Sequence, residues 1–250
     1  MPIESLRRDR LRGAAERMLR DQTPARRMRT QLAAERLAAW GSDRAVRFLD
    51  AGCDVGLLSV AMAERCPQWT IEAVDVNDEM LAMGRAWAAE QGLERIDFRH
   101  ADVTSDLAAG RYDAAAALEC LTVIPDLDGA LAGLAGALRP GGLFVAHVPD
   151  ADWEPALPGS PDEWPTAVRH GFRPEELAEL LDDHGLRVTW TQATMRTPLQ
   201  AAQELRDRIK TAPTRVRLSA HLGLAAAVWL ERRGLAFGPA RGLYVEAVRR

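Results

Sequence analysis

Two clusters of residues in the first third of the chain have the types and spacing to bind a nucleotide-like ligand. Asp50, Gly52 and Gly56 lie in the segment DAGCDVG, between a short apolar run and a helical pattern. In such a strand–turn–helix, backbone N–H groups and the helix dipole face the ligand. Asp75 ends the next apolar run, where an acidic side chain can accept hydrogen bonds from ribose hydroxyls. It can equally cap the helix that follows.

His147 is the histidine best placed for acid–base chemistry. It lies late in an apolar run over 143–148, which we expect to end at the ligand-binding edge of a parallel sheet. An imidazole there can take up a proton or contact an acceptor, or it can be a purely structural histidine. The sequence contains no evident Ser-His-Asp set or metal-ligand cluster, and its single lysine, Lys210, lies outside any phosphate-binding loop.

Two tryptophans, Trp153 and Trp164, lie in a proline-rich segment directly after that run. Such a segment is typical of a loop, and loops carry function more often than the elements they connect. The two indoles therefore either line an acceptor pocket or anchor the loop to the core.

The elements that must position these residues alternate along the chain. Short apolar runs and helical patterns of 10–15 residues follow each other from residue 46 onward, which is typical of βαβ units. They predict an α/β fold: a doubly wound, mostly parallel, seven-stranded Rossmann-like sheet with N-terminal helices and a two-helix insert, 198–234, before the last strand. The predicted strands are 46–49, 70–74, 96–99, 112–118, 143–148, 187–193 and 242–248, and the principal helices are 3–20, 24–40, 57–63, 79–91, 127–138 and 174–184.

Five short blocks in this order resemble class I S-adenosylmethionine-dependent methyltransferases. Asp50–Gly56 is similar to the family's acidic, glycine-rich loop, and the family's second block resembles Val74–Leu81. Asp102-Val103 and Tyr112-Asp113 follow in the expected places, and Leu138–Leu143 resembles the family's Pro-Gly-Gly turn before the fifth strand. The resemblance covers residues 46–148.

The resemblance implies S-adenosyl-L-methionine as cofactor and S-adenosyl-L-homocysteine as product. It places Asp75 on the ribose, Met80 beside the adenine, and Glu119 with Cys120 near the sulfonium, although Cys120 can also be a small buried hydrophobe. The cofactor-binding residues expected on this basis are Asp50, Gly52, Cys53, Gly56, Asp75, Val76, Met80, Asp102, Val103, Glu119 and Cys120.

The sequence departs from the family pattern at two places. Asp54 replaces the middle glycine of the first loop, and Asp tolerates the left-handed backbone region better than most residues. We expect its side chain to turn outward, toward water, an arginine or a backbone amide. The fourth strand ends in Glu119-Cys120-Leu121-Thr122, without the Asn/Asp-Pro-Pro-aromatic tetrad of enzymes that methylate amino groups of nucleic-acid bases.

Composition and charge narrow the class of partner. The chain has 250 residues, 47% hydrophobic and 27% charged, which suits one α/β domain with an appendage. The net charge of −4 divides into +6 over residues 1–47, −17 over 48–195 and +7 over 196–250. An acidic centre argues against nucleic-acid binding. The basic ends either dock on the acidic centre or attract an anion or a membrane surface.

The remaining features favour a cytoplasmic protein without a membrane-inserted segment. The longest apolar stretch, 222–230, is shorter than the roughly 20 residues that cross a bilayer. Arginines occupy the N-terminal segment where a signal peptide needs an apolar core. The three cysteines are spaced too widely for a disulfide framework or a zinc site.

Together these features predict a helical cap over 1–41 and a methyltransferase domain over 42–250. The expected reaction is methyl transfer to oxygen or nitrogen of a small molecule, in bacterial secondary metabolism by association with the alanine- and arginine-rich composition. The insert 198–234 should cover the acceptor pocket or form a homodimer interface. Two alternatives remain: a cofactor-binding cyclase or scaffold that transfers no methyl group, and a module that binds a membrane or partner.

Overall fold

The computed structural model describes residues 24–160, 166–209 and 214–250. The helix predicted over 3–20 and the side chain of Trp164 lie outside these residues. Within the described ranges, the seven predicted strands form one sheet, in the order β3-β2-β1-β4-β5-β7-β6. The strands are β1 (Arg47–Ala51), β2 (Thr70–Asp75), β3 (Ile96–His100), β4 (Tyr112–Leu118), β5 (Leu138–Pro149), β6 (Leu186–Arg196) and β7 (Ala240–Arg249).

The first five strands run parallel and β7 is antiparallel to both of its neighbours. The α/β fold predicted from the alternation is therefore confirmed. Chain order reverses between β1 and β4, so the carboxyl ends of these strands open onto the crevice where doubly wound sheets bind ligands.

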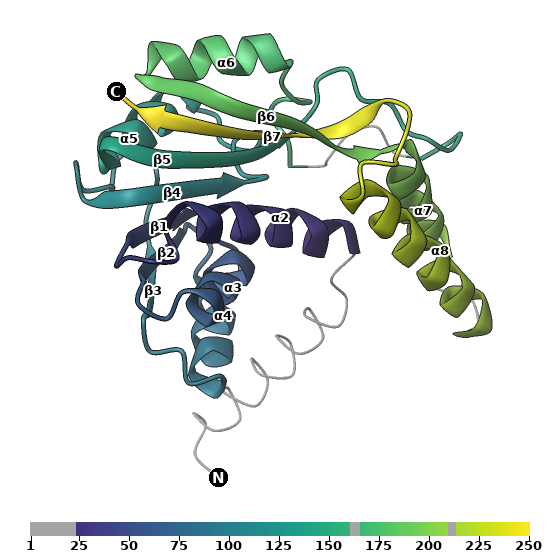
Figure 1. Ribbon diagram of the computed structural model, residues 1–250, viewed down its shortest axis with the longest axis horizontal. Helices are drawn as coiled ribbons and strands as arrows, with labels where there is room; N and C mark the ends of the chain where they lie inside the picture. Colours follow the sequence, from purple (N-terminus) through teal and green to yellow (C-terminus); the bar gives the residue numbers. More distant parts are fainter. Residues whose placement is uncertain (1–23, 161–165, 210–213) are drawn as a thin grey trace.

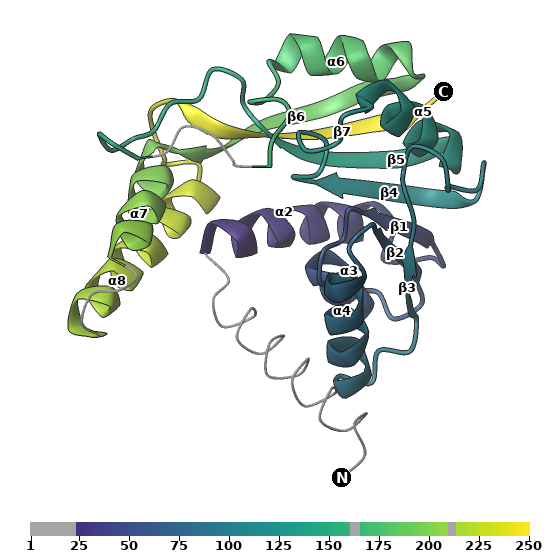
Figure 2. The same ribbon diagram turned by 180° about the vertical axis from the view of Figure 1, so that it is seen from behind.

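The helices cover both faces of the sheet (Figures 1 and 2). Core residues of α5 and α6 pack on one face, and those of α2, α3 and α4 pack on the other. The helices are α2 (Pro24–Gly41), α3 (Leu57–Arg65), α4 (Asp78–Glu90), α5 (Leu127–Ala137), α6 (Pro174–Asp183), α7 (Thr197–Arg208) and α8 (Thr214–Arg232).

The central strand β4 shows how tertiary context decides local structure. Residues 114–117 are four consecutive alanines, the residue with the highest helix propensity, yet they form strand. All four are fully buried between β1 and β5. Their small side chains let the helices of both layers approach the middle of the sheet.

Helix α2 contacts the last two strands of the sheet, β7 and β6, through Arg36. The guanidinium of Arg36 makes a bidentate contact with the Glu246 carboxylate, at 2.5 and 2.8 Å, and stacks 4.0 Å above the centre of the Trp190 ring. The amino-terminal half of α2 is thereby held above the crevice.

The insert predicted at 198–234 forms the helices α7 and α8, which extend from one end of the molecule (Figure 1). A small apolar cluster attaches them to α2 and to the end of β6. It consists of Met28, Met195, Leu199, Leu224 and Ala227. Among the helices that the structure describes, none combines the length and apolarity needed to cross a membrane.

Two glycines of α5 provide a test of how this helix packs. A Cβ at Gly133 would fall on the carbonyl oxygen of Val103, whereas a Cβ at Gly136 would meet no atom within 4 Å. We expect Gly133→Ala to lower the free energy of unfolding by about 1–3 kcal/mol, because backbone has to move. Gly136→Ala should raise it by up to about 1 kcal/mol through helix propensity. Urea titration of both variants measures this, and equal effects would contradict the packing.

Candidate active site

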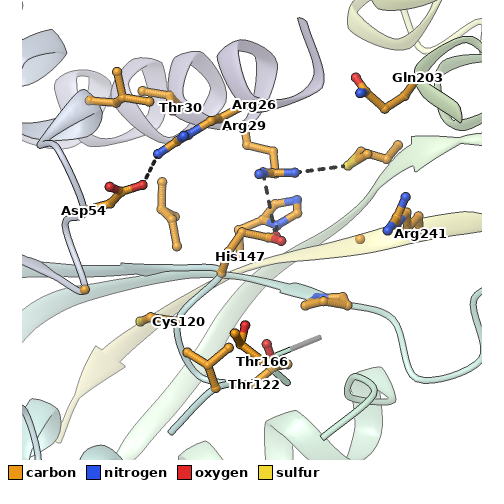
Figure 3. Close-up of a pocket in the computed structure, with 18 of the residues that line it drawn as sticks. Arg26, Arg29, Thr30, Asp54, Cys120, Thr122, His147, Thr166, Gln203 and Arg241 are labelled. Atoms are coloured by element: carbon orange, nitrogen blue, oxygen red, sulfur yellow. Dashed lines mark hydrogen bonds and ion pairs between the residues drawn. The ribbon is translucent and has the colours of Figure 1, made fainter. Parts of the chain in front are cut away.

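A cavity of about 930 Å³ opens at the carboxyl ends of the central strands. This is near the upper end of the range for small-molecule sites, about 300–1,000 Å³. Its walls come from the loops after β1 and β4, from the last residue of β2, from the starts of α2 and α3, from α7, from the ends of β5, β6 and β7, and from the loop residues Gly159, Ser160 and Thr166 (Figure 3). Segments from nearly the whole chain therefore meet around one space.

The loop after β1 enters this cavity in a strained conformation. Gly52 has φ +66°, and a Cβ there would lie 2.6 Å from Cβ of Cys120. Cys120 contributes to the same wall and lies 3.4 Å from the carbonyl oxygen of Ala51 through its Sγ. Residue 52 must therefore be glycine, because the ends of β1 and β4 pack too closely there for a side chain.

Asp54 has the left-handed backbone and the arginine partner predicted for it, but its side chain lines the cavity instead of turning outward. Its φ of +53° lies in the left-handed region, and its carboxylate forms an ion pair with Arg26 of α2 (Figure 3). The second carboxylate oxygen, Oδ1, is buried and has no hydrogen-bond partner among the described residues. The loop therefore keeps its shape without glycine and presents one unsatisfied acceptor beside the cavity.

Asp75 joins the loops after β1 and β2. One carboxylate oxygen accepts the backbone N–H of Asp54 and the other accepts that of Asn77, each at 2.9 Å. The N-cap of α4 is Asn77, whose side chain accepts from the backbone of residues 79 and 80. The alternative role considered for Asp75, that of the helix cap, is therefore filled by its neighbour, and Asp75 lines the cavity.

Asp50 is almost fully buried under the same loop. Its Oδ2 accepts two hydrogen bonds from Ser59, at 3.1 Å from the backbone nitrogen and 2.6 Å from the hydroxyl. Burial raises the pKa of Asp50 to about 6, against the opposing effect of Ser59 and with a further rise from Asp75 and Asp54. Three carboxyl groups thus share the β1–β2 side of the cavity, which favours a cation there.

A second group of polar residues lies at the ends of β4 and β5. Nδ1 of His147 contacts the carboxylate of Glu119, and its Nε2 lies 2.8 Å from the hydroxyl of Thr194. Arg29 of α2 approaches Glu119 at 3.7 Å and the sulfur of Met195 at 3.5 Å (Figure 3). His147 is 1% exposed, so this set lies in the interior while lining the cavity.

The charge states of this pair follow from its surroundings. Burial would raise the pKa of Glu119, but the charge of Arg29 and the hydrogen bond from His147 outweigh it and hold that pKa at about 2. Burial lowers the pKa of His147 despite the adjacent carboxylate. A neutral imidazole beside an ionised acceptor must carry its proton on Nδ1, which leaves the Nε2 lone pair facing Thr194.

Trp153 supports the cavity from behind. The ring is buried between the guanidinium of Arg241, 4.0 Å from its centre, and the imidazole of His170, with 5.2 Å between the ring centres. Arg241 itself lines the cavity. Of the two roles predicted for Trp153, these contacts favour that of an anchor. By stacking on Arg241, Trp153 holds this arginine of β7 in the cavity wall.

Other predicted cofactor residues lie around the cavity without lining it. Gly56 begins α3 with φ +74°, and a Cβ there would lie 2.6 Å from the Phe98 ring. Val76 is exposed, and Met80 packs beside the loop after β1. The Asp102 carboxylate accepts from the backbone and hydroxyl of Thr104 within its own turn, and Val103 is buried in the core. The residues that line the cavity as expected are Asp50, Gly52, Cys53, Asp75, Glu119, Cys120 and His147.

Several cavity residues were not predicted from the sequence. Arg26, Arg29, Met195 and Arg241 stand on elements far apart in the chain, and no local motif marks them. The insert 198–234 gave the one available signal, since long excursions in compact domains are usually functional. Helix α7 forms a wall of the cavity through Gln203, Glu204, Asp207 and Arg208.

The fold and this site define a class of protein: a doubly wound α/β protein with an acidic, glycine-containing loop after its first strand and a buried histidine–glutamate pair beside the same cavity. Comparison with known proteins identifies the family. Residues 24–190 match the family model described as a methyltransferase domain. The chain belongs to this family, and it is an S-adenosylmethionine-dependent methyltransferase.

Individual relatives agree with this assignment. The chain is 32% identical over 174 residues to a ubiquinone biosynthesis O-methyltransferase of Xanthomonas axonopodis pv. citri, covering 65% of this chain and 71% of that protein. Two solved structures share the fold: a geranyl diphosphate methyltransferase in complex with S-adenosylmethionine, at 18% identity and TM-score 0.62, and the [4+2]-cyclase SpnF, at 24% identity and TM-score 0.62. They align over 89% and 88% of this chain and over 84% and 80% of their own chains.

The described residues fit the cofactor of this family. S-adenosylmethionine carries a sulfonium and an ammonium group, and the β1–β2 side of the cavity supplies Asp50, Asp54 and Asp75. The buried, unpaired Oδ1 of Asp54 is an acceptor that a cationic ligand can satisfy. When bound, the cofactor supplies an electrophilic methyl group.

The raised pKa of Asp50 predicts how cofactor affinity depends on pH. A cation favours the ionised carboxylate, so binding below pH 6 requires loss of a proton, and affinity should fall by up to about tenfold per pH unit. Asp50→Asn should flatten this dependence between pH 5 and 7.5, as measured by isothermal titration with S-adenosylmethionine. An unchanged slope in the variant would assign the proton to another group.

The same shift predicts the stability of the free protein. Asp50 binds its proton more tightly when folded, so its contribution to stability is present below about pH 4 and is lost as pH rises through 6. The loss amounts to up to about 3 kcal/mol. Asp50→Asn should therefore be more stable than wild type at pH 8 and no more stable at pH 4.

Variants of Asp75 and Asn77 can distinguish a role in ribose binding from a role in helix capping. Asp75→Ala should weaken cofactor binding by about 1.5–3 kcal/mol, because charge-assisted hydrogen bonds are lost. Asn77→Ala removes the α4 cap and should lower stability by about 0.5–2 kcal/mol while leaving cofactor affinity within about threefold. Calorimetric titration with S-adenosylhomocysteine and thermal unfolding measure the two effects. Equal loss of affinity in both variants would reduce Asp75 to a structural role.

Proposed function

We propose that this enzyme methylates an oxygen of a small-molecule acceptor, with His147 as the general base. The observation that carries the proposal is the neutral imidazole in the cavity wall, with its Nδ1–H facing ionised Glu119 and its basic Nε2 facing Thr194. A hydroxyl acceptor must lose a proton as the new bond forms, whereas an amine can lose it afterwards. A buried base therefore supports oxygen over nitrogen.

The relatives support the same choice, because the matched proteins of Xanthomonas and Dinoroseobacter are named ubiquinone biosynthesis O-methyltransferases. The proposal extends to this chain only the reaction type, O-methylation. A role in bacterial secondary metabolism remains a prediction from composition.

Each residue of the second group has a distinct part in this proposal. The Thr194 hydroxyl, which bonds to His147 Nε2 and does not itself line the cavity, turns away, and Nε2 then takes up the acceptor proton. Glu119 holds the imidazole and stabilises its positive charge once protonated. Arg29 keeps Glu119 ionised. Gly242 lets the backbone of β7 pass close to the imidazole of His147, since a Cβ at residue 242 would lie 2.6 Å from Cε1 of His147.

We assign the cap of the acceptor pocket to α2 and α7. Both helices contribute side chains to the cavity wall from the same side of the sheet (Figure 3), where Met28 of α2 packs with Leu199 of α7. This favours the cap role predicted for residues 198–234. The domain division at residue 41 and a homodimer through α7 and α8 remain predictions.

His147→Asn tests the base. We expect kcat to fall by about 10²–10⁴-fold, the usual contribution of a general base, with S-adenosylhomocysteine affinity within threefold of wild type. His184→Asn, at the end of α6 far from the cavity, is the matched control and should leave both unchanged. In wild type kcat should fall as His147 becomes protonated, and this fall should come at a more acidic pH than for an ordinary histidine, because burial lowers the pKa of His147 below 6.5.

The assay supplies labelled S-adenosylmethionine with phenols, carboxylates and amines. Transfer to hydroxyl compounds alone is the expected result. Transfer to amines alone would overturn the O-methyltransferase proposal. Cofactor binding without transfer to any acceptor would favour the alternative of a non-methylating cyclase or scaffold.

A further inference from the structure

Gln203 on α7 is a buried amide whose hydrogen bonding is incomplete. It is 6% exposed and lines the cavity, into which its side chain points from α7 (Figure 3). Its Nε2 donates to a carboxylate oxygen of Asp207 at 2.9 Å. Because a carboxylate can only accept, this contact fixes the amide orientation. The other end of the amide, Oε1, is buried without a hydrogen-bond partner among the described residues.

A second buried glutamine on the same helix shows that burial on α7 does not by itself leave an amide oxygen without a hydrogen-bond partner. Gln200 lies one turn earlier and is 3% exposed. Its Nε2 donates to the carbonyl oxygen of Glu154 at 2.6 Å and to the Glu204 carboxylate at 3.0 Å, and it does not line the cavity. The unsatisfied amide is the one that faces the ligand space. A buried acceptor without a partner reduces stability, and its position in the cavity wall means that a bound ligand can supply the missing hydrogen bond.

The position of Gln203 identifies which ligand can reach it. The acids suited to the cofactor lie at the carboxyl ends of β1 and β2 and in the loop after β1, whereas Gln203 belongs to the α7 wall with Glu204, Asp207 and Arg208. An amide oxygen accepts a hydrogen bond from a hydroxyl or amino group and offers nothing to a carbonyl or an ether. The complementary group is therefore a donor on the acceptor molecule, separate from the oxygen that receives the methyl group.

We propose that Gln203 is a specificity-determining residue that accepts a hydrogen bond from a second hydroxyl or amino group of the acceptor. This inference rests on the proposed O-methylation. The substrate class is then a small molecule with at least two polar hydrogens, one lost on methylation and one bound by Oε1. A site built to bind such a donor discriminates strongly against analogues without it, because its acceptor is left unsatisfied.

Six probe acceptors test this without assuming where the second donor stands. They are catechol, resorcinol and hydroquinone, each with its monomethyl ether, which keeps one hydroxyl and lacks the second. We expect wild type to prefer at least one diol over its ether by tenfold or more in kcat/KM, after division by two for its equivalent hydroxyls. Gln203→Met should reduce this preference to threefold or less, mainly by slowing the diol.

Gln200→Met is the matched control and should retain the wild-type preference. The thermal midpoint of Gln203→Met should not fall below that of Gln200→Met, because Gln203→Met removes an unsatisfied acceptor whereas Gln200→Met breaks two hydrogen bonds. This readout separates substrate recognition from a folding defect.

The outcomes are distinct. A preference that survives in Gln203→Met, or an equal loss on diol and ether, overturns the role of Gln203 and leaves O-methylation standing; a water molecule then satisfies Oε1. If wild type methylates every ether as fast as its diol, the role of Gln203 is likewise overturned and O-methylation stands. Binding of S-adenosylhomocysteine with no methylation of any probe overturns both proposals.

Discussion

The site depends on keeping a carboxylate ionised inside the protein. Glu119 ends β4 beneath the crevice, where an isolated charge would be strongly destabilising unless it were paired. Its compensation comes from three separate elements: Arg29 on α2, His147 on β5 and the charge of Arg241 on β7. The cavity can form only when these elements converge, so the geometry of the site is tied to the completion of the fold.

Backbone strain marks the same place. Among the described residues that are not glycine, three have φ in the left-handed region: Asp54, Glu119 and Met195. All three line the cavity, which agrees with the tendency of strained conformations to gather at functional sites. Two arginines one helical turn apart hold them, since Arg26 pairs with Asp54 and Arg29 contacts the other two. Helix α2 is therefore part of the site as well as a cover for the sheet.

The fold could be predicted from the sequence because its signals are local. Most strands and helices between residues 24 and 150 carry their own pattern and turn chemistry, and the loop after β1 carries its glycines; β4 is the exception, because its alanines favour helix. The same locality made Asp50, Gly52 and Asp75 predictable as cavity residues and Asp54 predictable in its backbone conformation.

The second half of the site could not be predicted in this way. Arg29 is one of many arginines among the first 47 residues, and only its approach to Glu119 across 90 residues of sequence distinguishes it. The role of Trp153 likewise depends on Arg241, contributed by a strand almost 90 residues later. The contact of Trp153 with Arg241 follows from the register of β5 against β7, in which Pro149 pairs with Gly242, and residue patterns do not specify that register.

This division has a consequence for how acceptor choice is encoded. The family match ends at residue 190, whereas Met195, Gln203, Arg241 and Gly242 line the cavity from positions beyond it. The cofactor acids Asp50, Asp54 and Asp75 all lie within the match. If the acceptor binds against α7 as proposed, a shared family fixes the reaction more firmly than the acceptor, because that wall is built from α7 and from the strands before and after the α7–α8 insert. Substitutions in those segments can change the acceptor without disturbing the loop that holds the cofactor.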